Sequence, residues 1–453
     1  MRGGLHQSGA STRCAAPHSI LAMKDVAVTP TTPQTPVPAL LHLGGAARPG
    51  LCTDCGVSRM GDGKACGRAC QFIAPNYPAL ERAVHGRVAR DAGDEAFFGV
   101  TLSMQRARLS PPAPGAQWTG LTTAIAARLL ETGAVDAVLT VAPDPQDRWK
   151  PRPVIVTDPE ALAACRGMRM GYAPLLAALE PARAAGHRRL AVIGIPCQVY
   201  ALRALEAELD FDALTVIGTP CSDNTTTENF HHFLSLLDPA PETISYLEFR
   251  TDFRVELRFD DGRAPRCVPF LSLPISDLPA DFFPMTCKTC VDYTNRLADL
   301  TVGYMGGDGD QWVIARNERG AAALAGLGDR LSTRPLTDRG KRTGAVRGFL
   351  ANTERAAGGM PLRRMPDWLR PLVSFLQPRI GPRGLEFARA RVEMKAVETV
   401  LHLRRAHPAR IKNMVPAHVW RLVAAYGLSP RPEEAPARSE PTEVNPDPSA
   451  PAE

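Results

Sequence analysis

Aromatic side chains are scarce in this sequence, and it contains no long uninterrupted run of apolar residues. Phe, Trp and Tyr make up 6% of the 453 residues, and no apolar stretch reaches the roughly 18 residues that a membrane-spanning helix requires. The N-terminus also lacks the apolar core of a secretory signal peptide. The net charge of +6 is too small to indicate nucleic-acid binding. These absences favour a cytoplasmic globular protein whose length allows two or three domains.

A glycine-rich dinucleotide fingerprint is also missing. No G-x-G-x-x-G sequence follows a predicted strand, so nothing indicates a Rossmann-type phosphate loop. Cysteine, in contrast, is present in 11 copies, an odd number. In a chain without an export signal the thiols stay reduced, so a disulfide framework is disfavoured. Clustered cysteines in such a chain indicate metal or redox ligands.

Eight of the cysteines fall into two groups, whereas Cys14, Cys165 and Cys267 stand apart. The first group is Cys52, Cys55, Cys66 and Cys70, and the second is Cys197, Cys221, Cys287 and Cys290. Eight thiolates are the ligands of two [4Fe–4S] clusters, four for each. The first group alone also fits a zinc ribbon. Cys197 and Cys221, taken singly, are also compatible with inert core residues.

The alternation of apolar runs with helical periodicity predicts an α/β fold, with a mixed, mainly parallel sheet core and flanking helices. Strands are predicted at 135–141, 153–156, 190–195, 214–217, 244–250, 255–260 and 300–304, and helices at 121–131, 174–185, 198–209, 228–237 and 385–402. Cys197 and Cys221 each follow a proline just past such a strand. Open α/β sheets bind their cofactors at the carboxyl ends of the strands.

Composition divides the chain into five parts. Residues 1–49 and 429–453 are predicted to be disordered tails, because the first holds proline-rich repeats and the second holds many prolines and acidic residues. Residues 50–115 form an N-terminal cysteine-rich segment that we expect to be the iron–sulfur segment, 116–330 an α/β catalytic core, and 331–428 a basic helical C-terminal region.

The stretch 361–421 carries 13 Lys and Arg but only 4 Asp and Glu, a net charge of about +9. It is either a solvated helical appendage or a docking face for an acidic protein or a membrane surface. Arg404 and Arg405 are the arginines that we expect to contact an acidic partner.

Six motifs follow one another along the chain. They are Leu51–Ile73 (LCTDCG…ACGRACQFI), Gln117–Gly120 (QWTG), Gly194–Gln198 (GIPCQ), Cys287–Asn295 (CKTCVDYTN), Ala298–Gly306 (ADLTVGYMG) and Arg316–Gly320 (RNERG). In these motifs the sequence resembles the coenzyme F420 hydrogenase/dehydrogenase beta-subunit superfamily over about residues 50–425. It is most similar to the branch that holds ferredoxin-dependent divinyl chlorophyllide 8-vinyl reductase and 7-hydroxymethyl chlorophyll a reductase.

The resemblance implies an oxidoreductase that carries FAD and two [4Fe–4S] clusters and takes electrons from ferredoxin. The implied reaction reduces the 8-vinyl group of a tetrapyrrole, divinyl chlorophyllide or protochlorophyllide, to ethyl in bacteriochlorophyll or chlorophyll biosynthesis. The alternatives are reduction of 7-hydroxymethyl chlorophyll a, another F420- or ferredoxin-linked beta subunit, or a non-enzymatic, zinc-stapled electron-transfer or scaffold subunit. The implied location is cytoplasmic or peripheral to photosynthetic membranes, and assembly as a homo-oligomer is left open.

One departure from the branch concerns the first cysteine group. The branch carries a third cysteine in the form CxxCGxC, and this chain has Ser58 at that place. Cys66 is the expected substitute because it lies between Cys55 and Cys70, with ligation by Ser58 as the alternative.

The resemblance also assigns residues to the flavin. These are Thr119, Gly120, Thr122, Thr123, Arg166, Gly167, Asn295 and Gly306. A helix that begins after Gly120 would offer free N–H groups to a phosphate, although an ordinary helix start produces the same pattern. Arg166 would supply charge to the pyrophosphate, although an ordinary surface arginine is an equal alternative.

The reaction also needs a proton donor and an apolar substrate site. Tyr304, Asp308 and Asp292 are the candidate catalytic residues; His231 and His232 are further candidates, although such a pair is more typical of a helix surface. Trp312, Phe270, Phe282 and Phe283 are candidates for contact with a flat tetrapyrrole and are equally compatible with the protein core.

Overall fold

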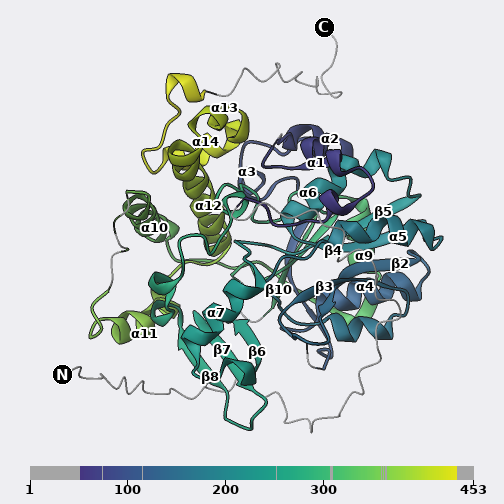
Figure 1. The fold of residues 1–453 in the computed structure, drawn as a ribbon, viewed down its shortest axis with the longest axis horizontal. Coiled ribbons are helices and arrows are strands. Elements are labelled where there is room, and N and C mark those ends of the chain that lie inside the picture. The colour runs from purple at the N-terminus through teal and green to yellow at the C-terminus, as the bar shows by residue number, and fades with distance from the viewer. Residues whose placement is uncertain are drawn as a thin grey trace.

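The computed structural model describes residues 51–73, 75–114, 116–250, 252–306, 310–358, 360, 362 and 365–435 (Figure 1). Cys14, with the rest of the expected N-terminal tail, and Asp308 lie outside the described residues. Within the described ranges no helix is both long enough and apolar enough to cross a membrane.

An eight-stranded sheet forms the centre of the molecule, in the order β11-β1-β10-β9-β5-β4-β2-β3. Its strands are β1 (Ser103–Leu109), β2 (Ala137–Pro143), β3 (Pro151–Val156), β4 (Arg189–Gly194), β5 (Ala213–Gly218), β9 (Leu300–Gly303), β10 (Gln311–Ala315) and β11 (Leu331–Arg334). The four strands β2, β4, β5 and β9 pair in parallel, and antiparallel strands flank them on both sides. The expected mixed α/β sheet is confirmed, with parallel pairing at its centre.

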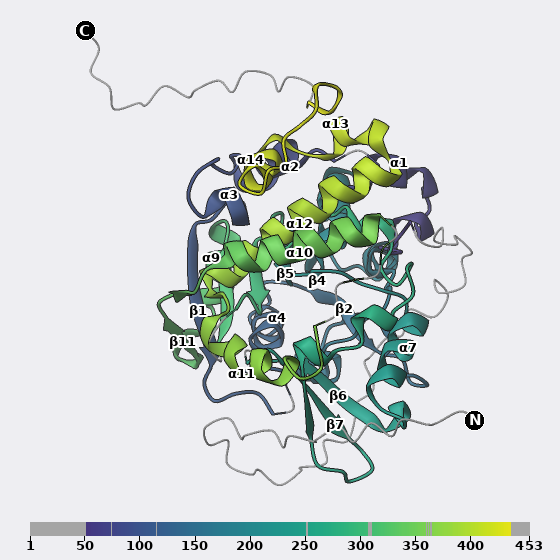
Figure 2. The same ribbon diagram turned by 90° about the vertical axis from the view of Figure 1, so that its left-hand side faces the viewer.

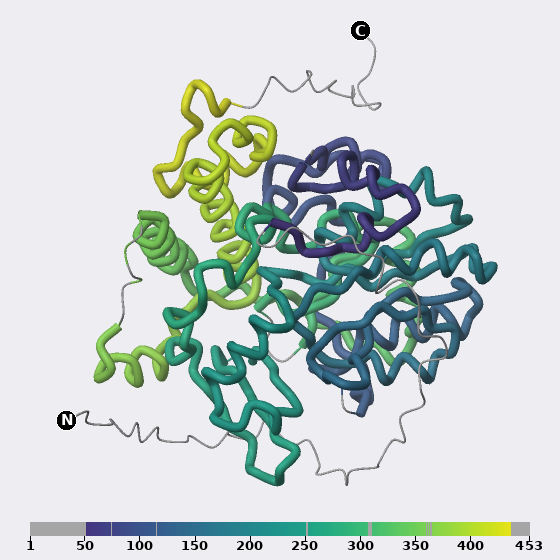
Figure 3. The backbone as a smooth tube through the Cα atoms, in the orientation of Figure 1, coloured from purple at the N-terminus to yellow at the C-terminus, as the bar shows by residue number. Residues whose placement is uncertain are grey.

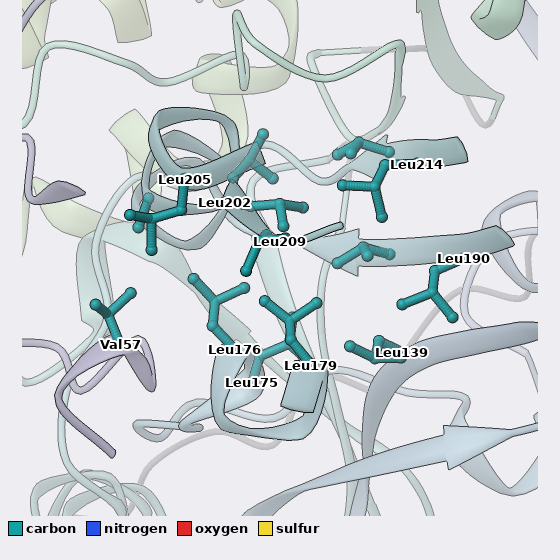
Figure 4. Packing of buried hydrophobic residues seen from close by; sticks show 14 of the residues in the cluster. Val57, Leu139, Leu175, Leu176, Leu179, Leu190, Leu202, Leu205, Leu209 and Leu214 are labelled. Carbon is teal, nitrogen blue, oxygen red and sulfur yellow. The ribbon is translucent and has the colours of Figure 1, made fainter. Parts of the chain in front are cut away.

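Alternate residues of the central strands enter two different cores. On β4, Leu190 and Val192 pack with Leu202 on one face, beside α5 (Leu179–Ala184) and α6 (Pro196–Leu205) (Figure 4). Ala191 enters the opposite core, where α4 (Leu121–Glu131) and α9 (Glu318–Ala325) contribute Ile125 and other apolar residues. Burial on both faces explains why these strands are continuous apolar runs in the sequence.

The cysteine-rich segment packs directly on the sheet core. It consists of the 3-10 turns η2 (Val57–Arg59) and η3 (Gly63–Ala65), then α1 (Cys66–Ala69), α2 (Tyr77–His85) and α3 (Glu95–Phe98). Val57 joins the leucines of the core (Figure 4). The rings of Tyr77 and Tyr200 on α6 meet edge to face, with their centroids 5.1 Å apart. The segment therefore shares its core with the sheet.

Helices predominate after β11. They are α10 (Arg342–Ala357), α11 (Arg370–Ile380), α12 (Leu385–Ala406), α13 (Ile411–Met414) and α14 (Ala417–Ala424). α12 lies beside α10 (Figure 2) and shares a core with Trp312 of β10. The N-terminal segment lies next to α13 (Figure 3), where Arg410 donates a hydrogen bond to the carbonyl of Phe72 at 2.6 Å. The N-terminal cysteine-rich segment and the C-terminal helices thus meet.

A second, three-stranded antiparallel sheet consists of β6 (Ile244–Phe249), β7 (Arg254–Phe259) and β8 (Arg266–Pro269). It packs with α7 (Thr227–Leu237) around Phe230 and Phe233. The Gln117 amide donates to the carbonyl of Leu247 at 2.9 Å, so this sheet touches the loop before α4. The strands expected at 244–250 and 255–260 are confirmed.

Candidate functional site

The carboxyl ends of β4 and β5 bring two cysteines to one edge of the sheet. The strands pair in register, with Gly194 opposite Gly218 at their ends. Cys197 and Cys221 each follow three residues later. The backbone N–H of Cys221 donates to the carbonyl of Tyr293 at 3.0 Å, which draws the segment after Cys290 to the same place.

Cys197, Cys221, Cys287 and Cys290 form one buried set, called the inner set below. Burial raises the pKa of the Cys221 thiol well above its ordinary value, and the neighbouring Cys287 and Cys290 raise it further. Burial does the same for Cys197, beside Cys221 and Cys290. The pKa of Cys290 is raised by burial to about 11. The structure therefore unites four cysteines that are up to 93 positions apart in the sequence.

Cys52, Cys55, Cys66 and Cys70 form a second set, called the outer set. Burial raises the pKa of Cys55, and the adjacent Cys52, Cys70 and Cys66 add to that rise. Ala65 before Cys66 is buried, but Gly67 and Arg68 after it are exposed, so this set reaches nearer the solvent than the inner one. Burial and the nearby Cys70 and Cys52 raise the pKa of the Cys66 thiol. The structure thus brings Cys66 together with the other three cysteines of the group.

Hydrogen-bond donors point at several of these sulfur atoms. The backbone N–H of Asp54 lies 3.2 Å from Cys52 Sγ, and that of Asn224 lies 3.4 Å from Cys287 Sγ. The side-chain amide of Gln71 lies 3.4 Å from Cys290 Sγ. Donors of this kind stabilise a thiolate relative to a thiol, and hydrogen bonds to cluster sulfurs tune iron–sulfur centres.

The donor chemistry of the two sets, four cysteine thiols in each, fits an iron–sulfur cluster. All eight cysteines are free thiols. A cubane takes four thiolates, one on each of its four irons. Within the described ranges no group of three or more His, Cys, Asp or Glu converges on a single point. Buried thiols of raised pKa would bind such a cluster with loss of their protons.

The two sets lie next to each other. Thr53 Oγ1 donates to Cys197 Sγ across 3.5 Å, and Cys55 contributes to the raised pKa of Cys197. The hydrogen bond joins the N-terminal segment to the start of α6, directly after β4.

A buried lysine beside the inner set is not apparent from the sequence motifs. Lys395 Nζ on α12 donates to the carbonyl of Cys287 at 2.6 Å and to the carboxylate of Asp223 at 2.8 Å. Its side chain is 2% exposed. The only indication of a buried lysine in the sequence is its place inside a helix with apolar periodicity. The contacts fix α12 to the segments that carry Cys221 and Cys287.

The loop before α4 is held in place by hydrogen bonds to β1 and β10. Thr119 is buried; its hydroxyl accepts the N–H of Leu109 at 3.0 Å and donates to Gln311 at 3.2 Å. Gln311 also accepts the first N–H of α4, from Leu121. Gly120 has φ +81°, and a Cβ there would lie 2.8 Å from the Cβ of Ala116. Thr119 and Gly120 thus build the turn, while Thr122 and Thr123 stand partly exposed on the first turn of α4.

Three arginines gather beside this loop, and none of them pairs with an acidic residue in the part of the chain that the structure describes. Burial lowers the pKa of both Arg166 and Arg169. Arg166 donates to the carbonyl of Pro114 at 2.8 Å, and Arg169 donates to the carbonyl of Arg166 at 2.8 Å. The Nε atoms of both, and that of Arg152 on β3, are buried without a hydrogen-bond partner within the described ranges. Guanidinium groups of this kind fit an anion such as a diphosphate.

Gly167 is exposed next to Arg166. The sequence singled out Arg166 and Gly167, but it gave no reason to choose Arg169 or Arg152.

Aromatic rings line the same edge of the sheet. Trp118 and Tyr304 stack with their centroids 5.2 Å apart and their planes 18° apart. Phe387 at the start of α12 lies 5.2 Å from Tyr304, centroid to centroid. Gly306, with φ +86°, allows this approach, because a Cβ there would lie 2.6 Å from the Cβ of Phe387. Burial raises the pKa of the Tyr304 hydroxyl, which therefore stays protonated.

Asp292 and Asn295 are fully buried among backbone groups. The Asp292 carboxylate accepts the N–H of Arg296 at 2.9 Å, and burial raises its pKa. The Asn295 amide donates to the carbonyl of Gly194 at 2.8 Å, while its Oδ1 is buried with no hydrogen-bond partner among the described residues. These contacts hold the segment after Cys290 against the end of β4.

The remaining sequence candidates lie elsewhere. His231 and His232 are exposed on α7, and His231 pairs with Asp147 at 2.8 Å. Trp312 is in the core, 6.5 Å from Phe98. Phe282 and Phe283 pack against each other in the core of the small sheet. Phe270 continues the aromatic edge through Phe253, 5.9 Å away.

Two models of one protein family match the sequence of this chain. Residues 104–180 match the N-terminal model of the coenzyme F420 hydrogenase/dehydrogenase beta subunit, and residues 187–339 match its C-terminal model. Together they cover half of the chain. This protein belongs to the coenzyme F420 hydrogenase/dehydrogenase beta-subunit family.

Two sequence relatives of this F420 hydrogenase/dehydrogenase family member match a larger part of the chain than the two family models do. The chain is 37% identical to the chloroplastic 7-hydroxymethyl chlorophyll a reductase of rice, over 81% of this chain and 80% of that protein. It is 36% identical to an uncharacterized protein of a Nostoc cyanobacterium, over 83% and 94%. A subunit of the F420H2 dehydrogenase of Methanosarcina mazei is 30% identical over 46% of this chain and 57% of that protein. The family is therefore one of oxidoreductases, and a chlorophyll reductase is among the relatives.

A solved structure, a chain of the F420-reducing [NiFe] hydrogenase complex from Methanosarcina barkeri, superposes with a TM-score of 0.47 at 22% identity. The match covers 53% of this chain and 84% of that chain.

Two of the motifs that suggested the family, Ala298–Gly306 and Arg316–Gly320, have a structural role. Asp299 accepts hydrogen bonds from Arg203 at 2.9 Å and from Asn317 at 2.7 Å, and its own N–H donates to Val216 of β5. A Cβ at Gly320 would lie 1.9 Å from the carbonyl oxygen of Asp299. The ADL and RNERG segments thus fix the order of the central strands. Breaking a buried ion pair such as Asp299–Arg203 costs about 3–5 kcal/mol.

The basic C-terminal region differs in two respects from the expectation. The guanidinium of Arg404 binds the carboxylate of Glu434 at 2.7 Å and lies over the Trp420 ring. Its choice as a contact for an acidic partner is therefore wrong, because the charge is already neutralised within the fold. Glu434 is 3% exposed, so residues 429–435, expected to be disordered, pack on α12. Arg405 is exposed.

Proposed function

We propose that this protein is an iron–sulfur flavoprotein that reduces a substituent of a chlorophyll-type tetrapyrrole with electrons from ferredoxin. The observation that carries the proposal is the likeness to the rice reductase over four fifths of both chains, together with two adjacent four-cysteine sets. The reaction proposed is reduction of the 8-vinyl group of divinyl chlorophyllide or protochlorophyllide to an ethyl group. It consumes two electrons and two protons.

The outer set and the inner set would each hold one [4Fe–4S] cluster, and FAD would lie at the edge lined by Trp118 and Tyr304. The clusters take single electrons from ferredoxin, and the flavin supplies them as a pair to the carbon–carbon double bond. Arg166, Arg169 and Arg152 would bind the diphosphate of FAD, with Thr122 and Thr123 at the helix start beside it. This assignment is supported by the three guanidinium groups, none of which has an acidic partner in the described structure.

Other residues of the chain position these groups. Thr53 and Gln71 donate hydrogen bonds to inner-set sulfurs at 3.5 and 3.4 Å. Lys395 holds the Cys287 loop through its carbonyl. Asn295 and Gly306 act as positioning residues, because one ties the cysteine loop to β4 and the other admits Phe387 beside Tyr304.

The proton donor we propose is Tyr304. Its hydroxyl is protonated, since burial raises its pKa, and its ring forms part of the aromatic edge. Asp308 remains a candidate two residues after Gly306. Asp292 is better explained as a structural residue, because its carboxylate caps the turn at Arg296.

Reduction of 7-hydroxymethyl chlorophyll a is the second candidate, favoured by the activity for which the rice relative is named. Both reactions use the same electron source and a similar macrocycle. The two differ in the substituent that must reach the flavin.

An anaerobic assay with two substrates tests the proposal. The protein, reconstituted with iron, sulfide and FAD, is incubated with reduced ferredoxin and either divinyl chlorophyllide a or 7-hydroxymethyl chlorophyll a, and the pigments are separated by chromatography. We expect the 8-ethyl product from the first substrate. Conversion of only the second would assign the alternative reaction. If neither pigment changes while ferredoxin reduces the bound flavin, the chlorophyll-type substrate is wrong.

A further inference from the structure

Helix α11 exposes an apolar face to solvent. Trp368 just before it is 78% exposed, Leu372 53%, Phe375 60% and Ile380 65%. Trp368, Leu372 and Phe375 are three to four positions apart, so they share one side of the helix, and Ile380 extends the exposed apolar surface at its C-terminal end. No residue of α11 is buried. Apolar side chains grouped in this way on a surface indicate a binding site and not the usual scatter of single exposed residues.

Basic groups accompany this face. Arg370 and Arg379 lie on α11, and Arg383 follows it. The Arg379 guanidinium lies 4.3 Å from the centroid of the Phe375 ring. Asp367, which pairs with Arg370 at 2.9 Å, is the one acidic residue between 365 and 385. Aromatic and aliphatic residues on one side with arginines beside them are typical of a helix that lies in the headgroup region of an anionic bilayer.

Helix α11 is connected by a row of aromatic rings to the edge of the site lined by Trp118 and Tyr304. In Figures 1 and 2 α11 lies at the periphery, near the three-stranded sheet and apart from α12 and α14. It contacts η8 (Phe270–Ser272). From Phe270, rings follow through Phe253 at 5.9 Å and Phe387 at 6.3 Å to Tyr304 at 5.2 Å. A continuous row of aromatic side chains thus leads from the α11 region to the candidate flavin edge.

We propose that the segment Trp368–Ile380 binds the surface of an anionic lipid bilayer. Its apolar side chains enter the headgroup region, while the arginines contact lipid phosphates. The aromatic row then gives a lipid-dissolved tetrapyrrole an apolar path to the site. This last role rests on the proposed function, whereas lipid binding itself does not.

Vesicle flotation with the full-length holoprotein tests the lipid surface. Vesicles of phosphatidylcholine alone are compared with vesicles that also contain phosphatidylglycerol. The double variant Leu372→Ser/Phe375→Ser removes apolar contact, and Arg379→Gln removes charge. Leu102→Ser is the matched control, because Leu102 is 52% exposed at the start of β1, outside the α11 segment. Circular dichroism and flavin content show that each variant is folded.

We expect binding to the anionic vesicles, reduced roughly tenfold or more by Leu372→Ser/Phe375→Ser and unchanged by Leu102→Ser. Arg379→Gln should weaken binding severalfold, and added salt should do the same. Trp368→Phe should remove the blue shift of tryptophan emission on vesicle addition.

Equal flotation of all variants, or none with anionic vesicles, would overturn the proposal. The alternative is that a second copy of this chain covers the face, and sedimentation measurements of the oligomeric state test it. If the unaltered protein is an oligomer that does not bind vesicles and the double variant is a monomer, the face is an interface between copies. Because no substrate is present, these results do not depend on whether the proposed reaction is correct.

Discussion

Thr53 Oγ1 donates a hydrogen bond to Cys197 Sγ over 3.5 Å. Thr53 follows the first cysteine of the outer set, and Cys197 begins the inner set, so the contact joins segments that are 144 residues apart in the chain. Clusters held by the two sets would therefore be neighbours. We expect electrons to enter at the outer set, which is nearer the solvent, and to pass inward.

Replacing Cys66 by Ala should remove one cluster and leave the flavin bound. The structure groups Cys66 with Cys52, Cys55 and Cys70. Two clusters correspond to about eight iron and about eight acid-labile sulfide per chain, so the variant should retain about half of each. Iron and sulfide analysis after anaerobic reconstitution measures this. Ser58→Ala is the control and should keep the full content; if it loses iron and Cys66→Ala does not, Ser58 is the ligand.

The double variant Arg166→Gln/Arg169→Gln should bind FAD at least about tenfold more weakly, because charge-assisted hydrogen bonds to a diphosphate contribute about 1.5–3 kcal/mol each. Fluorescence titration of the apoprotein with FAD measures the dissociation constant. Arg128→Gln, at the far end of α4, is the matched control. An unchanged constant for the double variant would exclude these arginines from the flavin site.

Protonation of His85 should make stability fall at mildly acidic pH. Burial lowers its pKa to about 4, although its hydrogen bond to the carbonyl of Arg296 opposes the shift. The unfolded chain, with a histidine pKa near 6.5, binds the proton first, so stability is lost as pH falls from about 6.5 toward 4. Between pH 7 and pH 5 this loss is about 1–2 kcal/mol.

Urea unfolding of the holoprotein at pH 7, 6 and 5 measures that loss. His85→Gln keeps a hydrogen-bond donor but cannot be protonated, so its stability should vary less with pH. His231→Gln, which replaces an exposed histidine, should behave like the unaltered protein. Identical pH profiles for all three proteins would show that His85 is not buried in its neutral form.

Ferredoxin-supported turnover should slow as salt rises, because the region 361–421 carries a net charge of about +9 and salt screens attraction to an acidic donor. Arg405→Glu/Lys412→Glu reverses two exposed charges and should lower the ferredoxin-supported rate severalfold at low salt. Dithionite-supported turnover should not change. Lys150→Glu, in the exposed loop between β2 and β3, is the control. A salt-independent rate would mean that these charges only solvate the helices.

The central strands and the cysteine groups could be predicted from the sequence, because their signals are local. Leu190–Ile195 and Leu214–Ile217 are short apolar runs, and both predictions match β4 and β5. The helix predicted at 121–131 agrees with α4 at both ends. Cysteine spacing grouped the same residues that the structure brings together.

Features that depend on distant partners could not be predicted. β1 (Ser103–Leu109) and β10 (Gln311–Ala315) pair with each other although about 200 positions separate them, and β1 contains Gln and two Arg among its seven residues. The roles of Lys395, Arg169 and Phe387 arise from contacts with other segments. Arg404 was misjudged for the same reason, since Glu434 lies 30 positions away.

The most direct test of electron transfer through the inner set uses Cys290→Ala. The variant, loaded with FAD, is mixed anaerobically with reduced ferredoxin in one experiment and with dithionite in another, and flavin absorbance is followed. If the inner set carries the electrons, the variant binds FAD normally and dithionite reduces it, whereas reduction by ferredoxin falls at least about a hundredfold. Flavin reduction by ferredoxin at the unaltered rate would contradict the route, and with it the assignment of Cys197, Cys221, Cys287 and Cys290 to a redox cluster.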